Sequence, residues 1–358
     1  MKNKLVNILK LYFSKAGFHI DRIPDVAYFK TKSALQLYDE IWYDLNRFSQ
    51  SISISGNHKL YNEVLAELVP DFSEFIVSAQ TAFVGIGKGN DTLNSYRRIT
   101  LNGNDLFEKV YRTDSSILTR LLWFYEHVHP LLDQDKIRVP QIKKVLSGTV
   151  ITIVYFEYAE LQKMTREQIL LSAIEIIRHL LSLEKSIDVL IPKAPENVSD
   201  YTTHEFNNIY MQPARRYAQQ HFGGSAFFDK IEKHLIESKP FFAHADINSK
   251  NLFEDHFLID WDTSGLYPMG CDVGKVVNWF YLTAETTAED VILLLKNQFK
   301  NQIKEADFNQ FLLGSLFFCF VFRASDIMFG NQVPGNMLNG IYAEIEKLFD
   351  APEFKKMQ

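Results

Sequence analysis

The stretch 241–272, FFAHADINSKNLFEDHFLIDWDTSGLYPMGCD, constrains this chain more than any other part of the sequence. Its polar residues stand on both sides of a short apolar run. His244, Asp246 and Asn251 come before Leu-Ile, and Asp260 and Asp262 come after it. A loop followed by a strand that ends in a carboxylate would bring Asp246, Asn251 and Asp260 to one point. Carboxylate and amide oxygens gathered in this way suit a hard cation such as Mg²⁺.

The spacing His-x-Asp-x-x-x-x-Asn is that of the catalytic loop of protein kinases, H-R-D-x-x-x-x-N, with Ala245 in place of the Arg. Phosphoryl transfer needs positioned charges rather than a strong nucleophile. Asp246 would orient or deprotonate an acceptor hydroxyl, and Asn251 and Asp260 would supply oxygen ligands to magnesium. The alternative, a polar surface turn between two strands, explains neither the offset of the Asn nor the carboxylate after the apolar run.

HADINSKN followed by LIDWDTSGLYPMGCDVG resembles the aminoglycoside phosphotransferase and choline kinase family of small-molecule kinases. Members of that family read H-G-D-x-x-x-x-N, then I-D-[WF]-[DE], then a further Asp about ten residues on. This chain departs from the pattern at Ala245, where the family has Gly. The resemblance implies an α+β, bilobal, protein-kinase-like fold with a small antiparallel-sheet lobe and a larger helical lobe.

The resemblance also implies a role for each polar residue of this stretch. Asp246 is implied to be the catalytic Asp. His244, in the same catalytic set, is expected to bond to backbone near the metal-binding strand. Asp272, in Cys-Asp-Val-Gly, is expected to brace the catalytic loop. The residues implied to hold metal are Asn251, Asp260 and Asp262.

Residues 81–112 predict a small antiparallel sheet. TAFVGIGKG, YRRITL and LFEKVYR have strand character and are separated by turn-rich links. The first link, 87–95, would cover the nucleotide phosphates, because glycines let backbone N–H groups approach anionic oxygens. Leu-Asn-Ser-Tyr-Arg, residues 93–97, resembles the family's Ser-Asn-x-x-Tyr-Arg stretch. The phosphate-binding candidates in this link are Gly87, Gly89 and Asn94.

Lys109, on the third of these strands, matches the kinase Lys that binds the phosphates and pairs with a Glu on the next helix. The helix predicted over 115–129 offers Glu126 as that partner. Two more strands, over 137–146 and 149–158, complete the predicted sheet. The last runs into Glu157 and Tyr158, which resemble the family's hinge, where backbone groups meet adenine.

The remaining sequence is mainly helical by its periodicity. A helix from Thr165 opens with a capping-box spacing to Gln168, and helical patterns continue after Asp272 to the C-terminus. We therefore expect a helical extension over 1–80, a nucleotide-binding lobe over 81–160 and a catalytic, acceptor-binding lobe over 161–358. The acceptor site is expected between the catalytic loop and the last helices, with Trp279, Tyr281 and Arg323 as candidate lining residues.

The composition restricts the partners that the protein can bind and its location in the cell. The net charge of -6 excludes a nucleic-acid binder that relies on overall positive charge. Cys271 and Cys319 cannot form a disulfide framework or a zinc site alone, which favours the cytoplasm. The apolar run 311–322 is too short to span a bilayer and predicts a buried helix. The basic helix predicted over 2–20 docks on its own domain or lies on the inner membrane face.

The interpretation is an ATP- or GTP-dependent kinase with Mg²⁺ that acts on a hydroxyl of a small molecule, sugar or glycan. Residues 17–24 resemble enzymes of bacterial surface-polysaccharide synthesis. Two alternatives remain: a glycosyltransferase that binds metal through Asp260-Trp261-Asp262, and a pseudokinase without transfer activity. A metallohydrolase built on His244, Asp246, Asp260 and His256 would leave the predicted sheet without a purpose.

Overall fold

The computed structural model describes residues 65–69, 71–72, 77–78, 85–86, 95–101, 103–199, 206–331, 333–335 and 337–351. The predicted helix over 2–20, the segment 17–24, and Gly87, Gly89 and Asn94 lie outside these residues. The chain divides into two compact units. Unit 1 holds Met1–Ser115 and Gln141–Tyr158, and unit 2 holds Ser116–Pro140 and Ala159–Gln358.

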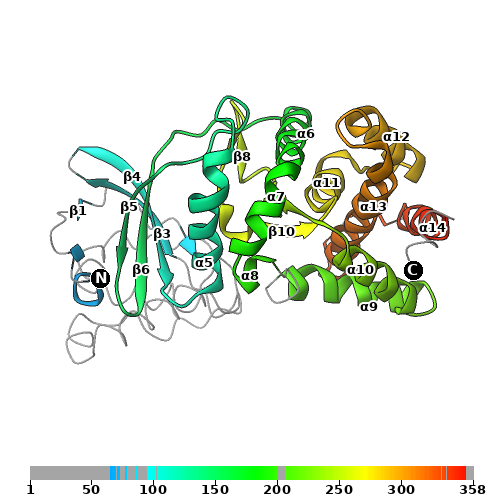
Figure 1. Cartoon of the computed structure of the whole chain (residues 1–358), viewed down its shortest axis with the longest axis horizontal. Helices are drawn as coiled ribbons and strands as arrows, with labels where there is room; N and C mark the ends of the chain where they lie inside the picture. Colours follow the sequence, from blue (N-terminus) through cyan, green and yellow to red (C-terminus); the bar gives the residue numbers. More distant parts are fainter. Residues whose placement is uncertain are drawn as a thin grey trace, which may run out of the picture. The chain divides into compact units, whose positions relative to one another are not determined.

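The core of unit 1 is a sheet of six strands in the order β1-β3-β4-β6-β5, with β2 also pairing β3 (Figure 1). All of these pairs are antiparallel, as the sequence predicted. The strands are β1 (Val77–Ser78), β2 (Gly85–Ile86), β3 (Ser95–Leu101), β4 (Asn104–Arg112), β5 (Ile142–Ser147) and β6 (Ile151–Glu157). Strand β5 begins later than the predicted 137–146, because Pro140 cannot donate a ladder hydrogen bond.

The two faces of β4 differ in burial because side chains alternate along a strand. Leu106, Glu108 and Val110 are buried, whereas Phe107 and Lys109 on the other face are half-buried. Glu108 accepts a hydrogen bond from Arg97 Nε of β3 at 2.6 Å, and both side chains are 1% exposed. This ion pair therefore fixes the β3–β4 register from inside the unit, on the face opposite Lys109.

Unit 2 is largely helical. Its α-helices are α5 (Ser116–Trp123), α6 (Arg166–Ser182), α7 (Glu184–Leu190), α8 (Glu196–Ser199), α9 (Gln212–His221), α10 (Ala226–Glu237), α11 (Cys271–Val276), α12 (Ala288–Phe299), α13 (Glu305–Met328) and α14 (Leu338–Phe349). Its shorter turns are η2 (Phe124–Val128), η3 (His129–Leu131), η4 (Ile191–Lys193), η6 (Asn207–Met211), η7 (Trp261–Thr263) and η8 (Val277–Tyr281). Strand β10 (Gly265–Pro268) pairs with β7 (Pro240–Ala243), and β8 (Leu252–Phe253) pairs with β9 (Phe257–Leu258). The Thr165–Gln168 capping box predicted from the sequence opens α6.

Helix α13 forms the centre of unit 2 and contacts α9, α11 and α14 (Figure 1). The window Asp307–Met328 has a mean hydropathy of 1.7, and 83% of it is buried. It is the one helix among the described residues that is long and apolar enough to cross a membrane. The burial confirms the core helix predicted over 311–322.

The segment 116–140, which the sequence analysis placed in the sheet-containing lobe, groups with unit 2. The physical reason is aromatic packing. Phe124 of η2 stacks on Trp261, with ring centroids 4.1 Å apart and planes 7° apart, and also lies against Phe242 of β7. Arg120 of α5, 1% exposed, donates from Nε to the backbone oxygen of Asp262 at 3.0 Å. These contacts attach α5 and η2 to the carboxylate-rich segment.

Candidate active site

The loop that follows β7 is held by the carboxylate of Asp272 at the start of α11. The backbone N–H groups of His244 and Ala245 donate to its two oxygens, at 2.9 Å and 2.7 Å. Burial raises the pKa of Asp272 to about 6, although these two N–H groups act in the opposite direction. These two bonds are of the kind expected of a residue that braces the loop, and the role of Asp272 stays a prediction.

The side chain of His244 connects the loop to the segment before Asp260. Its Nδ1 accepts from the backbone N–H of Asp246 at 3.1 Å, and its Nε2 lies 3.0 Å from the backbone oxygen of Ile259. One partner is a donor and the other an acceptor, so the ring is neutral with its proton on Nε2. Burial lowers the pKa of His244 to about 4, which keeps it neutral near pH 7. The contact with Ile259 O joins the His244 ring to the backbone near Asp260, and the functional role of His244 stays a prediction.

Asp246 is the partly exposed carboxylate of the loop, with 28% of its side chain accessible. Its Oδ2 accepts from Asn251 Nδ2 at 2.8 Å, and the same amide donates to the backbone oxygen of Asp246 at 2.9 Å. Its Oδ1 lies 2.5 Å from Nζ of Lys275. The carboxylate is therefore fixed from both sides and remains reachable from solvent.

Lys275, on α11, contacts Asp246 of the candidate site and was not predicted from the sequence. Its side chain is 1% exposed, and it also donates to the backbone oxygen of Ala245 at 3.0 Å and to the Tyr210 hydroxyl at 3.2 Å. The available signal was a lone Lys in the apolar run after Asp272, one helical turn away on the same face.

The turn 260–263 carries the two carboxylates predicted to bind metal. The strand before it ends at Leu258, earlier than predicted, and Asp260 has φ 65° and ψ 58° in the left-handed region, which Asp tolerates better than most residues. Asp260 is half-buried and Asp262 is buried. Trp261 anchors the turn by donating from Nε1 to the backbone oxygen of Leu258 at 2.9 Å. Thr263 Oγ1 donates to the backbone oxygen of His244 at 3.0 Å, which joins the turn to the loop after β7.

The chemistry of these residues fits magnesium bound together with a nucleotide. Because Asn251 directs its NH₂ group to Asp246, its amide oxygen faces away from that residue. The described residues contain no group of three or more His, Cys, Asp or Glu that could hold a metal ion by themselves. Magnesium in kinase sites is held by one or two carboxylates together with substrate phosphates, not by an all-protein cage.

The nucleotide-site candidates lie in unit 1. Lys109 is on the half-buried face of β4, with Nζ 5.7 Å from the Tyr111 ring centroid. The backbone N–H of Glu157 donates to Gln141 O at 2.9 Å, and its carboxylate lies 3.4 Å from Lys143 Nζ.

The ring of Tyr158, predicted to lie at the hinge, contacts a cation, since the Arg98 guanidinium lies 4.1 Å from its ring centroid. Glu126, the predicted partner of Lys109, belongs to unit 2. Its side chain is 74% exposed and lies 3.7 Å from His127 Nε2. The Lys109–Glu126 pair stays a prediction.

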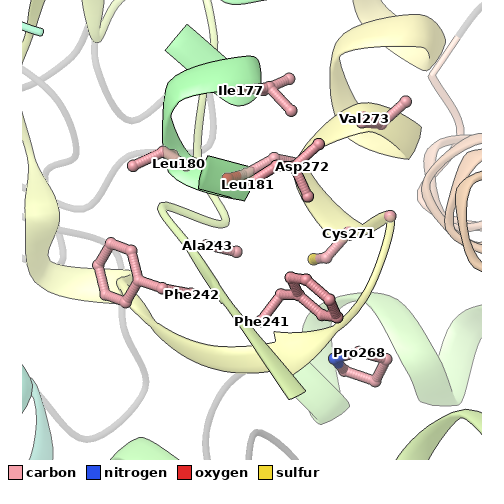
Figure 2. A pocket seen from close by; sticks show the side chains of 11 residues that line it. Ile177, Leu180, Leu181, Phe241, Phe242, Ala243, Pro268, Cys271, Asp272 and Val273 are labelled. Atoms are coloured by element: carbon pink, nitrogen blue, oxygen red, sulfur yellow. The ribbon is translucent and has the colours of Figure 1, made fainter. Parts of the chain in front are cut away.

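The candidate acceptor residues differ in exposure. Arg323 is 3% exposed and donates from an NH2 group to Asn278 O at 2.7 Å, so it belongs to the core of unit 2. Trp279 is 44% exposed, and the Tyr281 hydroxyl lies 3.4 Å from Asp290 O. Figure 2 shows a small hollow beside Asp272, between α6, β7 and α11. Its volume of about 20 Å³ and its mostly apolar lining make it too small for a sugar.

Comparisons with known proteins agree with this geometry. The phosphotransferase enzyme family (APH) matches residues 84–294, which is more than half of the 358-residue chain. No curated protein sequence matches the chain significantly.

Solved structures provide more distant similarities. The chain is similar to a microcompartment-associated aminopropanol kinase at 11% identity and TM-score 0.48, over 83% of this chain and 98% of that one. It is similar to the aminoglycoside phosphotransferase APH(4)-Ia at 12% identity and TM-score 0.44, over 82% of this chain and 99% of that one. It is similar to Plasmodium vivax ethanolamine kinase at 13% identity and TM-score 0.40, over 85% of this chain and 91% of that one.

The assignment rests on the family match, which spans the loop, the turn and α11, together with the antiparallel sheet and the helical unit. The described sheet has no alternating strand–helix order, which argues against the glycosyltransferase alternative. The chain belongs to the phosphotransferase enzyme family, APH, and is a kinase with the protein-kinase-like fold of that family.

Proposed function

We propose that this kinase transfers the γ-phosphoryl group of ATP to a hydroxyl group of a small molecule, with Mg²⁺. The observation that carries the proposal is the fixed, solvent-accessible carboxylate of Asp246, on a loop that Asp272 and His244 tie to the Asp260 turn. Such a group orients an acceptor hydroxyl and accepts its proton, and preorganisation supplies much of the rate.

Asn251 and Asp260 would hold the magnesium ion, with Asp262 as a further carboxylate of the turn. The ion would supply positive charge that stabilises the phosphate oxygens as charge develops on them. Asp262 is buried and its backbone oxygen is bonded to Arg120, so its main contribution is to hold the turn that presents Asp260.

Lys109 would bind the nucleotide phosphates, the link with Gly87, Gly89 and Asn94 would cover them, and the hinge at Glu157 and Tyr158 would meet the base. ATP is favoured over GTP because two structures similar to this chain are an APH(2")-IIa complex with streptomycin and ATP, and an APH(4)-Ia complex with ADP and hygromycin B.

For the acceptor we favour a sugar or glycan hydroxyl over a polycationic antibiotic. The polysaccharide-like segment 17–24 that supports this choice lies outside the described residues.

The proposal is tested by turnover of Mg²⁺-ATP in an acceptor screen that starts with sugars. Asp246→Asn should fold and lose kcat by about 10²–10⁴-fold, the usual contribution of a positioned acid–base group. Asp260→Ala should lose the magnesium-dependent thermal shift with ATP. Asp255→Asn, an exposed carboxylate on the β8–β9 turn, is the matched control and should keep both properties.

Other results would point elsewhere. Full activity in Asp246→Asn would refute the assigned role. Binding of Mg²⁺-ATP without turnover of any acceptor or of water would favour a pseudokinase. A thermal shift with UDP-sugars alone would favour glycosyl transfer.

A further inference from the structure

The ammonium group of Lys275 is surrounded by side chains that bind cations, beside the carboxylate of Asp246. All three of its hydrogens have acceptors: Asp246 Oδ1 at 2.5 Å, Ala245 O at 3.0 Å and the Tyr210 hydroxyl at 3.2 Å. The side chain is 1% exposed. Bound waters therefore have no part in holding this charge.

Two aromatic rings complete the arrangement. Nζ of Lys275 lies 4.9 Å from the ring centroid of Tyr210 on η6 and 5.2 Å from that of Phe322 on α13. The two rings meet edge to face, with centroids 4.8 Å apart. A carboxylate with aromatic faces around an ammonium is the chemistry by which proteins recognise amine and quaternary ammonium ligands. We call Asp246, Tyr210 and Phe322 the ammonium cage.

The ammonium group of Lys275 stays protonated inside the ammonium cage near pH 7. Burial by itself would lower the pKa of Lys275, but the Asp246 carboxylate outweighs it and raises this pKa above its ordinary value. Lys275 therefore faces any acceptor as a full positive charge next to the carboxylate that must receive the acceptor hydroxyl.

We infer that Lys275 fills the ammonium cage in place of a substrate amine, so that the acceptor is a hydroxyl compound with no cationic group beside its reacting hydroxyl, such as a neutral sugar or polyol. The inference rests on the proposed kinase function and narrows its acceptor class. A substrate ammonium near Asp246 would meet a like charge that cannot leave, which disfavours its binding.

Lys275 is at the same time a positioning residue for Asp246. It holds Oδ1 while Asn251 holds Oδ2, so the carboxylate plane is set before an acceptor arrives. Each carboxylate oxygen has two lone pairs, and the two contacts leave one free on each, so an acceptor hydroxyl can still donate to Asp246. A neutral hydroxyl needs only one of these lone pairs, whereas an amine held between Tyr210 and Phe322 would need the position that Lys275 occupies.

The first experiment examines the ammonium cage without any acceptor. Lys275→Ala removes a three-carbon chain and its ammonium, which n-propylammonium can replace and 1-propanol cannot. Thermal unfolding of the full-length variant should shift upward by more than about 2 °C, saturably, with n-propylammonium and not with 1-propanol. Wild type and Lys296→Ala, an exposed Lys on α12, should show no such shift. No saturable shift, or an equal shift with 1-propanol, would overturn the ammonium cage.

The second experiment measures acceptor preference with matched pairs: glucose and glucosamine, galactose and galactosamine, ethylene glycol and ethanolamine. Wild type should prefer the neutral member by at least about tenfold in kcat/KM. Lys275→Met, which keeps the length but not the charge, should lower kcat and leave KM for ATP unchanged. In this variant the kcat/KM values of the two members of each pair should differ by no more than about threefold. Preference of wild type for the amine, or an unchanged ratio in Lys275→Met, would overturn the acceptor class.

The two proposals fail in different ways. If Mg²⁺-ATP turnover depends on Asp246 but amines are preferred, the kinase function stands and the inference falls. If no turnover occurs, the kinase function falls, and the n-propylammonium titration still decides whether Lys275 fills a cation site. Should Lys275→Ala fail to fold, the inference is tested by the kcat/KM ratios of the matched acceptor pairs, measured with Lys275→Met.

Discussion

At the scale of single residues, Ala245 occupies a backbone conformation that suits glycine. Its φ of 62° lies in the left-handed region, which costs an L-residue about 1–2 kcal/mol. Asp272 compensates by accepting the N–H groups of Ala245 and His244. The family's usual Gly at this position has a direct physical explanation in that angle.

We therefore expect Ala245→Gly to relieve strain. Ala243 on β7 is the matched control, because it is also buried and loses the same methyl group, while its strand conformation disfavours Gly. The free energy of unfolding of Ala245→Gly should exceed that of Ala243→Gly by about 1–2 kcal/mol in urea titrations. Equal values would show that the strain is absent.

His244 and Asp272 couple stability to pH in opposite directions. The pKa of His244 falls from 6.5 to about 4 on folding, so the unfolded chain protonates first and stability is lost as pH drops through this range. The pKa of Asp272 rises from 3.8 to about 6, so its contribution is full below pH 3.8 and is lost as pH rises to 6. Each shift corresponds to about 3 kcal/mol, and in wild type the two largely cancel.

Comparing wild type with a variant that lacks one of the two residues should reveal how that residue makes stability depend on pH. The stability of wild type minus that of His244→Gln should grow by up to about 3 kcal/mol between pH 4 and pH 6.5. The same difference for Asp272→Asn should shrink by a similar amount between pH 4 and pH 6. Urea unfolding of the three proteins at pH 4, 5, 6 and 7 measures both slopes, and parallel curves would refute the coupling.

At the scale of elements, glycines set how closely α13 approaches its neighbours. A Cβ added at Gly314 would lie 2.0 Å from the backbone oxygen of Met269, and one at Gly274 would lie 2.6 Å from the backbone nitrogen of Cys319. Neither contact can be relieved by rotating a side chain. The segment that carries Asp272 and Lys275 is therefore held against α13 by backbone contact.

Gly314→Ala should lower the free energy of unfolding by about 3 kcal/mol or more, since a backbone atom must move to admit the methyl group. Gly340→Ala on α14 is the control, because it is exposed and its added Cβ would lie 3.4 Å from the Ala288 side chain. In a helix this change should stabilise by up to about 1 kcal/mol. Thermal and urea unfolding should show opposite signs for the two variants.

The sequence predicted the elements better than the contacts among them. The strands of the antiparallel sheet, the capped helix α6 and the buried α13 were readable because each has its own periodicity or turn chemistry. Asp246, Asn251, Asp260 and Asp272 could be proposed together from the sequence because they share one short stretch. Arg120 and Lys275 could not, since the contacts that define them join residues far apart in the chain or depend on burial.

At the scale of the whole molecule, Lys109 belongs to unit 1 and Asp260 to unit 2. The proposed function assigns both residues to the binding of Mg²⁺-ATP. Lys109→Met and Asp260→Ala should each weaken Mg²⁺-ATP binding, and the double variant should lose less than the sum of the two free-energy changes. Calorimetric titration of the four proteins measures this coupling. Strict additivity would place the two residues at independent sites.

The burial of α13 has a consequence for biosynthesis. The segments that cover it, η6, α9 and α11, are translated before it, and α14 follows it. The segments that contact α13 therefore leave an apolar surface uncovered until residue 328 has left the ribosome. The helix that then emerges is as apolar as a membrane span. Docking of this helix onto those segments buries both apolar surfaces. Variants that slow that docking should reduce the yield of soluble enzyme even where the finished fold would tolerate them.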